Sequence, residues 1–393
     1  MPSPPPWPTF AYAPLPRPVR KVGAPIGVII TLGVVIGLLI LLITATNPAG
    51  AILGFVLSSI AMTLVVFAYL WLDRWEPEPP RLLLLAFCWG AAIAVVASLI
   101  IGLVGDAVFG AVDSHPFASV AIRAPLVEEA AKGSFLLVMM TGRRRNELNS
   151  LTDCLVYAGL TAIGFAWLED IMYIAHPNSL TGSLVTAALR LIMSPFAHPL
   201  FTSMTAIGVF FALRRHSPFA KFACIFVGYC GAVFMHGLWN GSSTLGATAY
   251  FAVYVLWMAP IFVTMIVVAV LSRRHEQRLV ASKLPNMVVA GLITANEATW
   301  LGSLRTRRGA IAAATRGGGR PAGKALARFA AAVVELAFVR DRIDRGFGDA
   351  RVQALLQEEV QNVALARSAA PILGWLVNYR APEAGPAHPG YYR

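Results

Sequence analysis

IGVIITLGVVIGLLILLITA, residues 26–45, is a run of twenty residues without an ionisable side chain. An α-helix rises about 1.5 Å per residue, so about 20 apolar residues cross the roughly 30 Å of hydrocarbon in a bilayer. A run of this length and composition is typical of a transmembrane helix. It therefore predicts a membrane span near the start of the chain.

The composition of the whole chain agrees with this interpretation. Of its 393 residues, 57% are hydrophobic and only 13% are charged, which is about half the charged fraction of an ordinary soluble domain. Further apolar runs occur at about residues 51–72, 82–104, 117–140, 154–175, 184–213, 219–240 and 247–271. The sequence excludes a purely soluble protein and predicts an all-α fold, a polytopic membrane bundle of about eight transmembrane helices.

The charges of the connecting loops predict the topology. Basic residues occur in alternate loops, whereas the loops at 47–50, 105–116, 176–183 and 241–246 contain no Lys or Arg. Cytoplasmic loops carry an excess of Lys and Arg, so we expect a multi-pass protein of the cell membrane with both termini in the cytoplasm. The basic residues are Arg17, Arg20, Lys21, Arg74, Arg81, Arg143, Arg144, Arg145, Arg214, Arg215, Lys221, Arg273, Arg274 and Arg278.

Three regions are expected along the chain: a disordered Pro-rich cytosolic arm at 1–24, a membrane core at 25–272, and a basic helical cytosolic tail at 273–393. The first 18 residues hold eight prolines, which favour extended and solvated backbone. The net charge is +12, and the tail contributes 18 Lys and Arg against 9 Asp and Glu. Loop topology and anionic lipid explain this surplus as well as nucleic acid would, and no nucleic-acid partner is predicted.

Within the tail, a Gly317-Gly318-Gly319 linker separates two helical patterns. The later pattern, at about 322–344, aligns apolar residues on one stripe, and another helix is predicted at about 349–368. One interpretation is a small helical appendage packed on itself. The alternative is that its basic faces contact anionic lipid or a cytosolic partner. The stripe consists of Leu326, Phe329, Val333, Leu336 and Val339.

Ionisable side chains occur inside four of the apolar runs, where each costs about 2.5–3.5 kcal/mol on insertion scales and needs a partner or a function. Spans alternate in direction, which puts Glu128 and His198 roughly 18 Å below the outer boundary, and Asp170 and His236 roughly 8 Å below it. We therefore expect one shared, water-accessible cavity in the outer half of the bilayer. The polar residues are Arg123, Glu128, Glu129 and Lys132, then Glu169 and Asp170, then Arg190 and His198, then His236 and Asn240.

Helical spacing indicates which of these groups share a face. Glu128 and Glu129 precede Lys132 by four and three residues, and side chains at these spacings are neighbours on a helix surface. One lysine neutralises only part of the charge of two carboxylates, an arrangement that suits general acid–base chemistry. His236 and Asn240 are likewise four residues apart, as expected of an oriented base or an oxyanion stabiliser.

Three prolines, Pro125, Pro195 and Pro199, lie close to these polar groups in the sequence. Proline lacks a backbone donor and frees a carbonyl of the preceding turn, which is tolerated where a helix lines a cavity.

Purely structural interpretations exist for each of these polar features: a Glu–Lys pair can tie two helices, and a buried His can be a packing residue. Four polar clusters at matched depth favour a functional site over four unrelated structural roles.

Four motifs on consecutive spans resemble those of the PrsW family of intramembrane proteases, which is similar to the wider CAAX-protease and bacteriocin-processing group. The resemblance covers about residues 20–272. Each motif alone is weak, whereas the ordered set is specific. The motifs are Glu128-Glu129-x-x-Lys132, Phe165-x-x-x-Glu169-Asp170, His198-x-x-Phe201-Thr202 and His236-x-x-x-Asn240.

This resemblance implies a peptidase whose water-filled cavity cleaves membrane-anchored proteins, such as an anti-sigma factor cut on its extracytoplasmic side in a site-1-type reaction. In the wider group one glutamate activates water and the final His/Asn pair stabilises the oxyanion. Which of Glu128 and Glu129 is the base stays open. The implied catalytic residues are Glu128, Glu129, Glu169, His198, His236 and Asn240, supported by Lys132, Asp170, Phe165 and Thr202.

The sequence leaves the metal open. The motif His-Glu-x-x-His is absent, so zinc would need ligands from several helices, such as His198, His236 and Glu169. We therefore expect metal-independent glutamate chemistry, with zinc as the alternative.

Two other functions fit some of the same residues. Intramembrane carboxylates and histidines also form proton relays in transporters, although the inverted repeat common in transporters is not evident. A noncatalytic membrane scaffold that presents the basic tail to partners is the third hypothesis.

Overall fold

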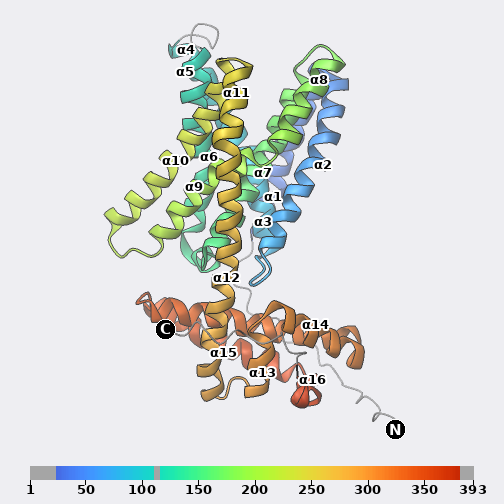
Figure 1. Cartoon of the computed structure of the whole chain (residues 1–393), viewed down its shortest axis with the longest axis vertical. Coiled ribbons are helices and arrows are strands. Elements are labelled where there is room, and N and C mark those ends of the chain that lie inside the picture. Colours follow the sequence, from blue (N-terminus) through green and yellow to red (C-terminus); the bar gives the residue numbers. More distant parts are fainter. Residues whose placement is uncertain (1–23, 110–115, 381–393) are drawn as a thin grey trace. The chain divides into compact units, whose positions relative to one another are not determined.

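The computed structural model describes residues 24–109 and 116–380, and every regular element within these ranges is a helix (Figure 1). Two compact units divide between Ser272 and Arg273. The predicted Pro-rich arm lies almost entirely outside the described residues. We call the unit that ends at Ser272 the membrane unit and the unit that begins at Arg273 the tail unit.

The membrane unit is a bundle of long helices, several of which are interrupted by π-helical segments. In chain order its elements are α1 (Ile26–Thr46), α2 (Pro48–Leu72), α3 (Pro80–Cys88), η1 (Trp89–Ala94), α4 (Val95–Phe109), α5 (Pro116–Ala118), η3 (Ser119–Arg123), α6 (Ala124–Met139), η4 (Gly142–Glu147), α7 (Leu151–Ala175), α8 (Leu180–Ala187), η5 (Ala188–Met193), α9 (Ala197–Ala212), α10 (Pro218–Thr244), α11 (Ala247–Val253), η6 (Tyr254–Met258) and α12 (Ala259–Val289), the last of which continues into the tail unit.

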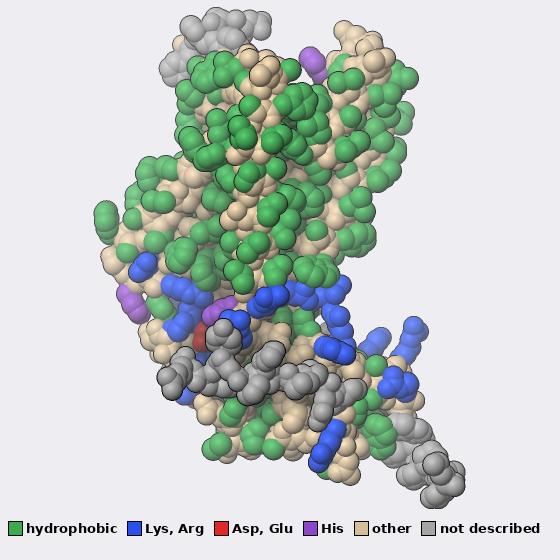
Figure 2. All heavy atoms as spheres, viewed as in Figure 1, with side chains coloured by type: hydrophobic (Ala, Val, Ile, Leu, Met, Phe, Trp, Pro, Cys, Tyr) green, Lys and Arg blue, Asp and Glu red, His purple; other side chains and the backbone are tan. Residues whose placement is uncertain are grey.

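The all-α membrane architecture expected from the sequence is confirmed. Seven helical segments in the described ranges are long and apolar enough to cross a bilayer, and hydrophobic side chains cover the visible face of the membrane unit (Figure 2). The expected span at 117–140 is not among the seven. It is nevertheless helical from Pro116 to Met139, and α6 packs against α4, α7, α9 and α10. Its charged residues, which lower its hydropathy, are those that the sequence singled out.

Helix α7 is the central helix of the bundle, and almost all of its residues are buried. Glycine permits its close contact with α3 and η1: a Cβ added at Gly164 would lie 2.0 Å from the carbonyl oxygen of Phe87, and one at Gly90 would lie 1.8 Å from that of Thr161. Small residues let helix backbones approach closely inside membranes, where packing rather than the hydrophobic effect drives association. These glycines therefore bring α7 and its polar residues into the middle of the bundle.

The predicted proline breaks lie where helices line the site. Residues 194–196 interrupt the path between η5 and α9, and the Tyr254 hydroxyl donates to the carbonyl of Met193 there (3.1 Å). In η3 the N–H of Ala124 donates to the carbonyl of Ser119, five residues earlier. In the same pattern the next hydrogen bond would run from the N–H of residue 125 to the carbonyl of Val120. Residue 125 is a proline and has no N–H, so this carbonyl has no helical donor. Both breaks therefore expose backbone acceptors inside the bundle.

The tail unit is a folded helical body. Its elements after α12 are α13 (Ala295–Leu301), α14 (Leu304–Asp344), α15 (Ala350–Ser368), α16 (Ile372–Trp375) and η7 (Leu376–Asn378). The apolar stripe predicted on the later pattern is buried. Lys283 Nζ lies 3.2 Å from Asp341 Oδ1, and Arg367 Nη1 lies 3.1 Å from Glu297 Oε1. Within the predicted Gly317–Gly319 linker, the two helical parts of α14 meet in a kink at Gly319, whose φ is 73°.

A buried carboxyl group, Glu78, lies in the segment between α2 and α3. Its Oε2 accepts a hydrogen bond from the Tyr157 hydroxyl (2.6 Å), and its N–H donates to Asp73 Oδ2 (2.9 Å). Burial, reinforced by the nearby charges of Asp153, Glu147 and Asp73, raises the pKa of Glu78 well above its ordinary value. The protonated form therefore fits this site better than the carboxylate does.

We predict that Glu78→Gln stabilises the protein above neutral pH. The folded state takes up a proton at Glu78 that the unfolded state has already lost, so stability falls as pH rises from the ordinary carboxyl pKa toward the folded value. Glutamine mimics the protonated acid and keeps an acceptor for Tyr157. We expect the thermal midpoint in micelles to rise by about 2–4 °C at pH 8, the effect of about 1 kcal/mol in a domain of about 150–250 residues. Near pH 4 the wild type and the variant should have the same thermal midpoint. An equal rise in the midpoint at both pH values would contradict a protonated Glu78 in the folded protein.

Candidate active site

A cavity of about 580 Å³ opens within the membrane unit, lined by residues of α4, η3, α6, α7, η5, α9, α10 and α11. Residues from all four predicted polar clusters line it. They are Glu128, Glu169, Asp170, His198, His236 and Asn240. The four clusters, separated by more than a hundred residues of sequence, therefore meet at one place.

Glu129 lies beneath the cavity lining and connects three helices. The carboxylate is fully buried. Its Oε1 lies 2.6 Å from Lys132 Nζ and 2.9 Å from His236 Nδ1, and its Oε2 accepts from the Thr202 hydroxyl at 2.9 Å. Both oxygens of Glu129 are thus engaged by donors from α6, α9 and α10. This glutamate orients its neighbours rather than facing the cavity.

Glu128, by contrast, faces the cavity with one oxygen unsatisfied. Its Oε2 is buried and has no hydrogen-bond partner among the described residues. This oxygen lies 3.7 Å from His236 Nε2 and 3.8 Å from Lys132 Nζ. Buried polar atoms are nearly always paired in native proteins, so an oxygen of this kind indicates a place for a ligand.

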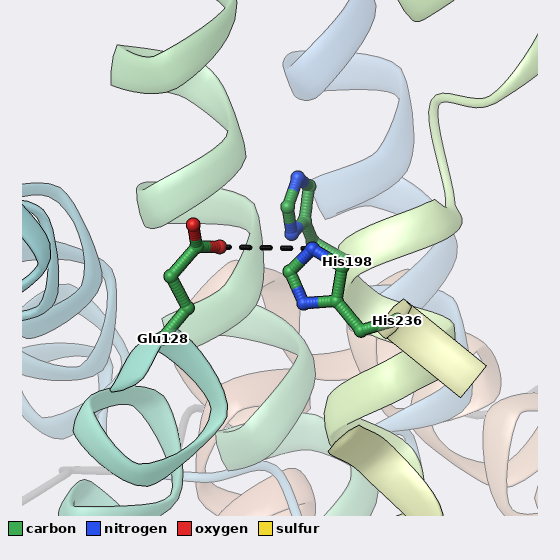
Figure 3. A group of neighbouring side chains, drawn as sticks. All are labelled: Glu128, His198 and His236. Atoms are coloured by element: carbon green, nitrogen blue, oxygen red, sulfur yellow. Dashed lines mark ion pairs between the residues drawn. The ribbon is translucent and has the colours of Figure 1, made fainter. Parts of the chain in front are cut away.

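The two histidines lie at right angles, with ring centroids 5.1 Å apart. Glu129 accepts from His236 Nδ1, which leaves Nε2 of that ring directed at Glu128 (Figure 3). His198 Nδ1 lies 3.1 Å from Lys132 Nζ, and its Nε2 lies 2.9 Å from Glu169 Oε2. Because an ammonium group can only donate, Nδ1 of His198 accepts and Nε2 donates to Glu169.

Aromatic rings fix both imidazoles in place. The Phe201 ring stacks on His236 with centroids 4.7 Å apart, and the Phe165 ring lies 5.2 Å from His198. Lys132 Nζ lies 4.4 Å above the centre of the Phe165 ring, within the range of a cation–π interaction. Phe165 and Thr202, predicted as supporting residues, thus touch the site from outside the cavity lining.

Asn240 lines the cavity one helical turn beyond His236. Its Nδ2 donates to the carbonyl of Val120 at 3.3 Å, the carbonyl that the π-helical turn before Pro125 leaves free. This hydrogen bond uses one of the two N–H bonds of the amide. The other remains for a group in the cavity.

Arg190 also lies at the site, although the four motifs did not include it. Its Nε lies 2.5 Å from Asp170 Oδ1, its Nη2 contacts Glu169 Oε2, and its guanidinium lies 4.2 Å above the Tyr173 ring. An arginine inside an apolar run must find a partner, and that requirement is the signal that could have paired it with Glu169 and Asp170. A second pair, Arg123 with Asp106, lies on the cavity wall.

Glu128, His198 and His236 could together hold a metal ion. Each offers one ligand atom, and these three atoms lie within 4.8 Å of one another. Glu169, which the sequence suggested as a ligand beside the two histidines, is not in this group; it is engaged by His198 and Arg190 instead. Four carboxylates, those of Glu128, Glu129, Glu169 and Asp170, surround only two cations, Lys132 and Arg190. A divalent cation would therefore balance the formal charge of this cluster.

We predict that Arg190→Gln destabilises the membrane unit by about 3–5 kcal/mol, because it leaves two buried carboxylates without their cation. A further Asp170→Asn substitution should restore part of the loss, since it removes one of these charges. The measurement is the free energy of unfolding in mixed micelles for both single variants and the double variant. Arg123→Gln is the matched control, because its partner Asp106 is 33% exposed, whereas the side chains of Glu169 and Asp170 are 11% and 4% exposed. An equal loss in the control would contradict the prediction.

Comparisons with known proteins match the segment of the chain that contains this site. Residues 78–265 match the PrsW-protease family, described as the PrsW family of intramembrane metalloproteases. A curated relative, Protease PrsW of Geobacillus kaustophilus (strain HTA426), is 25% identical over 184 residues, which is 47% of this chain and 76% of the relative. No solved structure matches. The matched segment contains all of the predicted site residues and confirms the resemblance seen in the motifs. Over this segment, just under half of its length, the chain is similar to the PrsW family of intramembrane proteases.

Proposed function

We propose that the chain is an endopeptidase that cleaves membrane-anchored proteins in the cavity of the membrane unit. The observation that carries this proposal is the convergence of Glu128, His198 and His236 with Glu169 at one polar cavity among apolar helices. Acid–base groups placed together in a water-accessible site are what peptide hydrolysis requires.

We further propose that Glu128, His198 and His236 bind zinc, in place of the metal-free chemistry expected from the sequence. Three features fit a divalent cation: the unsatisfied oxygen of Glu128, the free Nε2 of His236 facing it, and the excess of carboxylates. His198 would bind the metal through a ring nitrogen that carries no proton, because ligating imidazole nitrogens are deprotonated. When bound, zinc supplies a Lewis acid that polarises a carbonyl oxygen.

The remaining roles follow from the contacts of each side chain. Glu169 lines the cavity beside His198 and would accept the proton of the attacking water, while Arg190 holds its position. Asn240 would donate its free N–H to the oxyanion. Glu129 orients His236 by accepting its Nδ1–H, as carboxylates beside metal-ligating histidines do, and Lys132 donates to Nδ1 of His198.

The side of the membrane on which cleavage occurs is also proposed. The cavity lining includes Asp106, Ser243 and Gly246, which lie next to or within loops without Lys or Arg. Such loops are extracytoplasmic under the positive-inside rule. This supports a cut on the extracytoplasmic side of the substrate, as in site-1-type cleavage of an anti-sigma factor, the substrate class that the family resemblance implies.

The first experiment compares new protein N-termini in membranes of cells that express wild type, Glu128→Gln or Glu169→Gln at equal levels. N-termini that depend on the wild type should cluster beside the outer ends of substrate spans. Loss of the general base Glu169 is expected to slow cleavage about 10²-fold or more, and loss of the proposed metal ligand Glu128 is expected to slow it as well. Glu358→Gln in the tail unit is the matched control. Identical N-termini in all four strains would overturn the proposal and favour transport or a scaffold.

The second experiment measures bound metal. Purified wild type is expected to carry one zinc ion per chain by elemental analysis, and His198→Ala and His236→Ala should each lose it. Chelation should abolish peptidase activity and added zinc should restore it. Full activity in a metal-free preparation would contradict the zinc proposal while leaving the peptidase intact, with Glu128 as the base.

A further inference from the structure

The exposed side of α14 carries a one-sided row of basic residues. Between Leu304 and Val334 the chain has seven Lys and Arg and no Asp or Glu. Six of the seven are exposed, and we call these six the basic stripe. They are Arg305, Arg308, Arg316, Arg320, Lys324 and Arg328. None of the six forms an ion pair with an acidic residue anywhere in the described ranges.

The spacing of the stripe follows the turn of the helix. Arg305, Arg308 and Arg316 lie three and eight residues apart, and Arg320, Lys324 and Arg328 lie four apart. These intervals put side chains on one face. The kink at Gly319 separates the two groups of three. The opposite face of α14 is apolar and buried, with Leu326, Phe329 and Val333 inaccessible to solvent. The stripe is therefore a fixed surface of a folded body.

Other basic residues of the tail unit are arranged differently. Lys283 is paired with Asp341 and Asp344, Arg345 with Asp341, and Arg367 with Glu297. The contacts of Lys283 and Arg367 join different helices of the tail unit, whereas that of Arg345 lies at the end of α14. Such pairing gives these three residues a structural role, whereas the six residues of the stripe have no acidic partner in the described ranges.

We propose that the basic stripe binds the anionic headgroups of the membrane in which the chain is embedded. Helix α12 supplies both the last candidate span and the first helix of the tail unit, so the tail is covalently tethered to the bilayer and its effective concentration at the surface is high. The loop charges predict that it lies on the cytoplasmic side, where lipids such as phosphatidylglycerol or phosphatidylserine carry negative charge. The proposal is independent of the peptidase activity.

The test uses the full chain in vesicles. Ala312, exposed between Arg308 and Arg316, is replaced by Cys and labelled with a fluorescent donor, after Cys224→Ser and Cys230→Ser; Cys88 and Cys154 are buried. Energy transfer to acceptor-labelled lipid headgroups is measured in neutral phosphatidylcholine and in vesicles with about a third of phosphatidylglycerol. We expect higher transfer in the anionic vesicles and a loss of this difference as salt screens the charges.

The variant that tests the stripe replaces Arg320, Lys324 and Arg328 by Gln. Each basic residue near an anionic surface is worth about fivefold in binding, so attachment should weaken by about a hundredfold. The matched control replaces Arg340, Arg351 and Arg380, three exposed basic residues outside the stripe, by Gln and should keep the lipid response. Circular dichroism confirms that both variants are folded.

Equal transfer in neutral and anionic vesicles would overturn the proposal, as would an equal loss in the two variants. A parallel arm adds single-stranded RNA to protein in neutral vesicles. Stripe-dependent RNA binding without a response to anionic lipid would assign the surface to nucleic acid and contradict the lipid proposal.

Discussion

The carboxylate of Glu129, fully buried in an apolar bundle, is the constraint on which the site depends. A charge in this setting is tolerated only when its oxygens have hydrogen-bond donors. Lys132, Thr202 and His236 supply those donors from α6, α9 and α10. The need to satisfy one anion thereby fixes three helices against each other and sets the orientation of one cavity histidine. Glu128, one residue away, is left to face the cavity.

Much of this arrangement could be predicted from the sequence, because a lipid environment leaves few alternatives. Apolar runs give the helices, and the cost of intramembrane charge makes Glu128, His198 and His236 candidates from the sequence alone. The span at 117–140 shows the limit of the same reasoning. Its polar residues identify the site. The same residues lower its hydropathy, so it is not among the seven helices that length and hydropathy select.

What the sequence could not give depends on side-chain direction between helices. Glu128 and Glu129 are equivalent by spacing to Lys132, and only the packing of α6 separates the cavity residue from the buried anchor. Glu169 fits a metal ligand by its motif, whereas in the folded chain Arg190 and His198 lie against it. Asn240 reaches the carbonyl of Val120 only because η3 is π-helical before Pro125. These relations need three-dimensional register, which periodicity alone does not contain.

The break at residues 194–196 has an electrostatic consequence. Because α9 begins inside the bundle at Ala197, the positive end of its backbone dipole, equivalent to about half an elementary charge, lies at the cavity wall. An unbroken helix from α8 would carry that partial charge to the loop before Leu180. The interruption instead places this positive end and the negative end of η5 at Met193 together at the cavity wall, where the first favours the carboxylates and the second favours the guanidinium of Arg190.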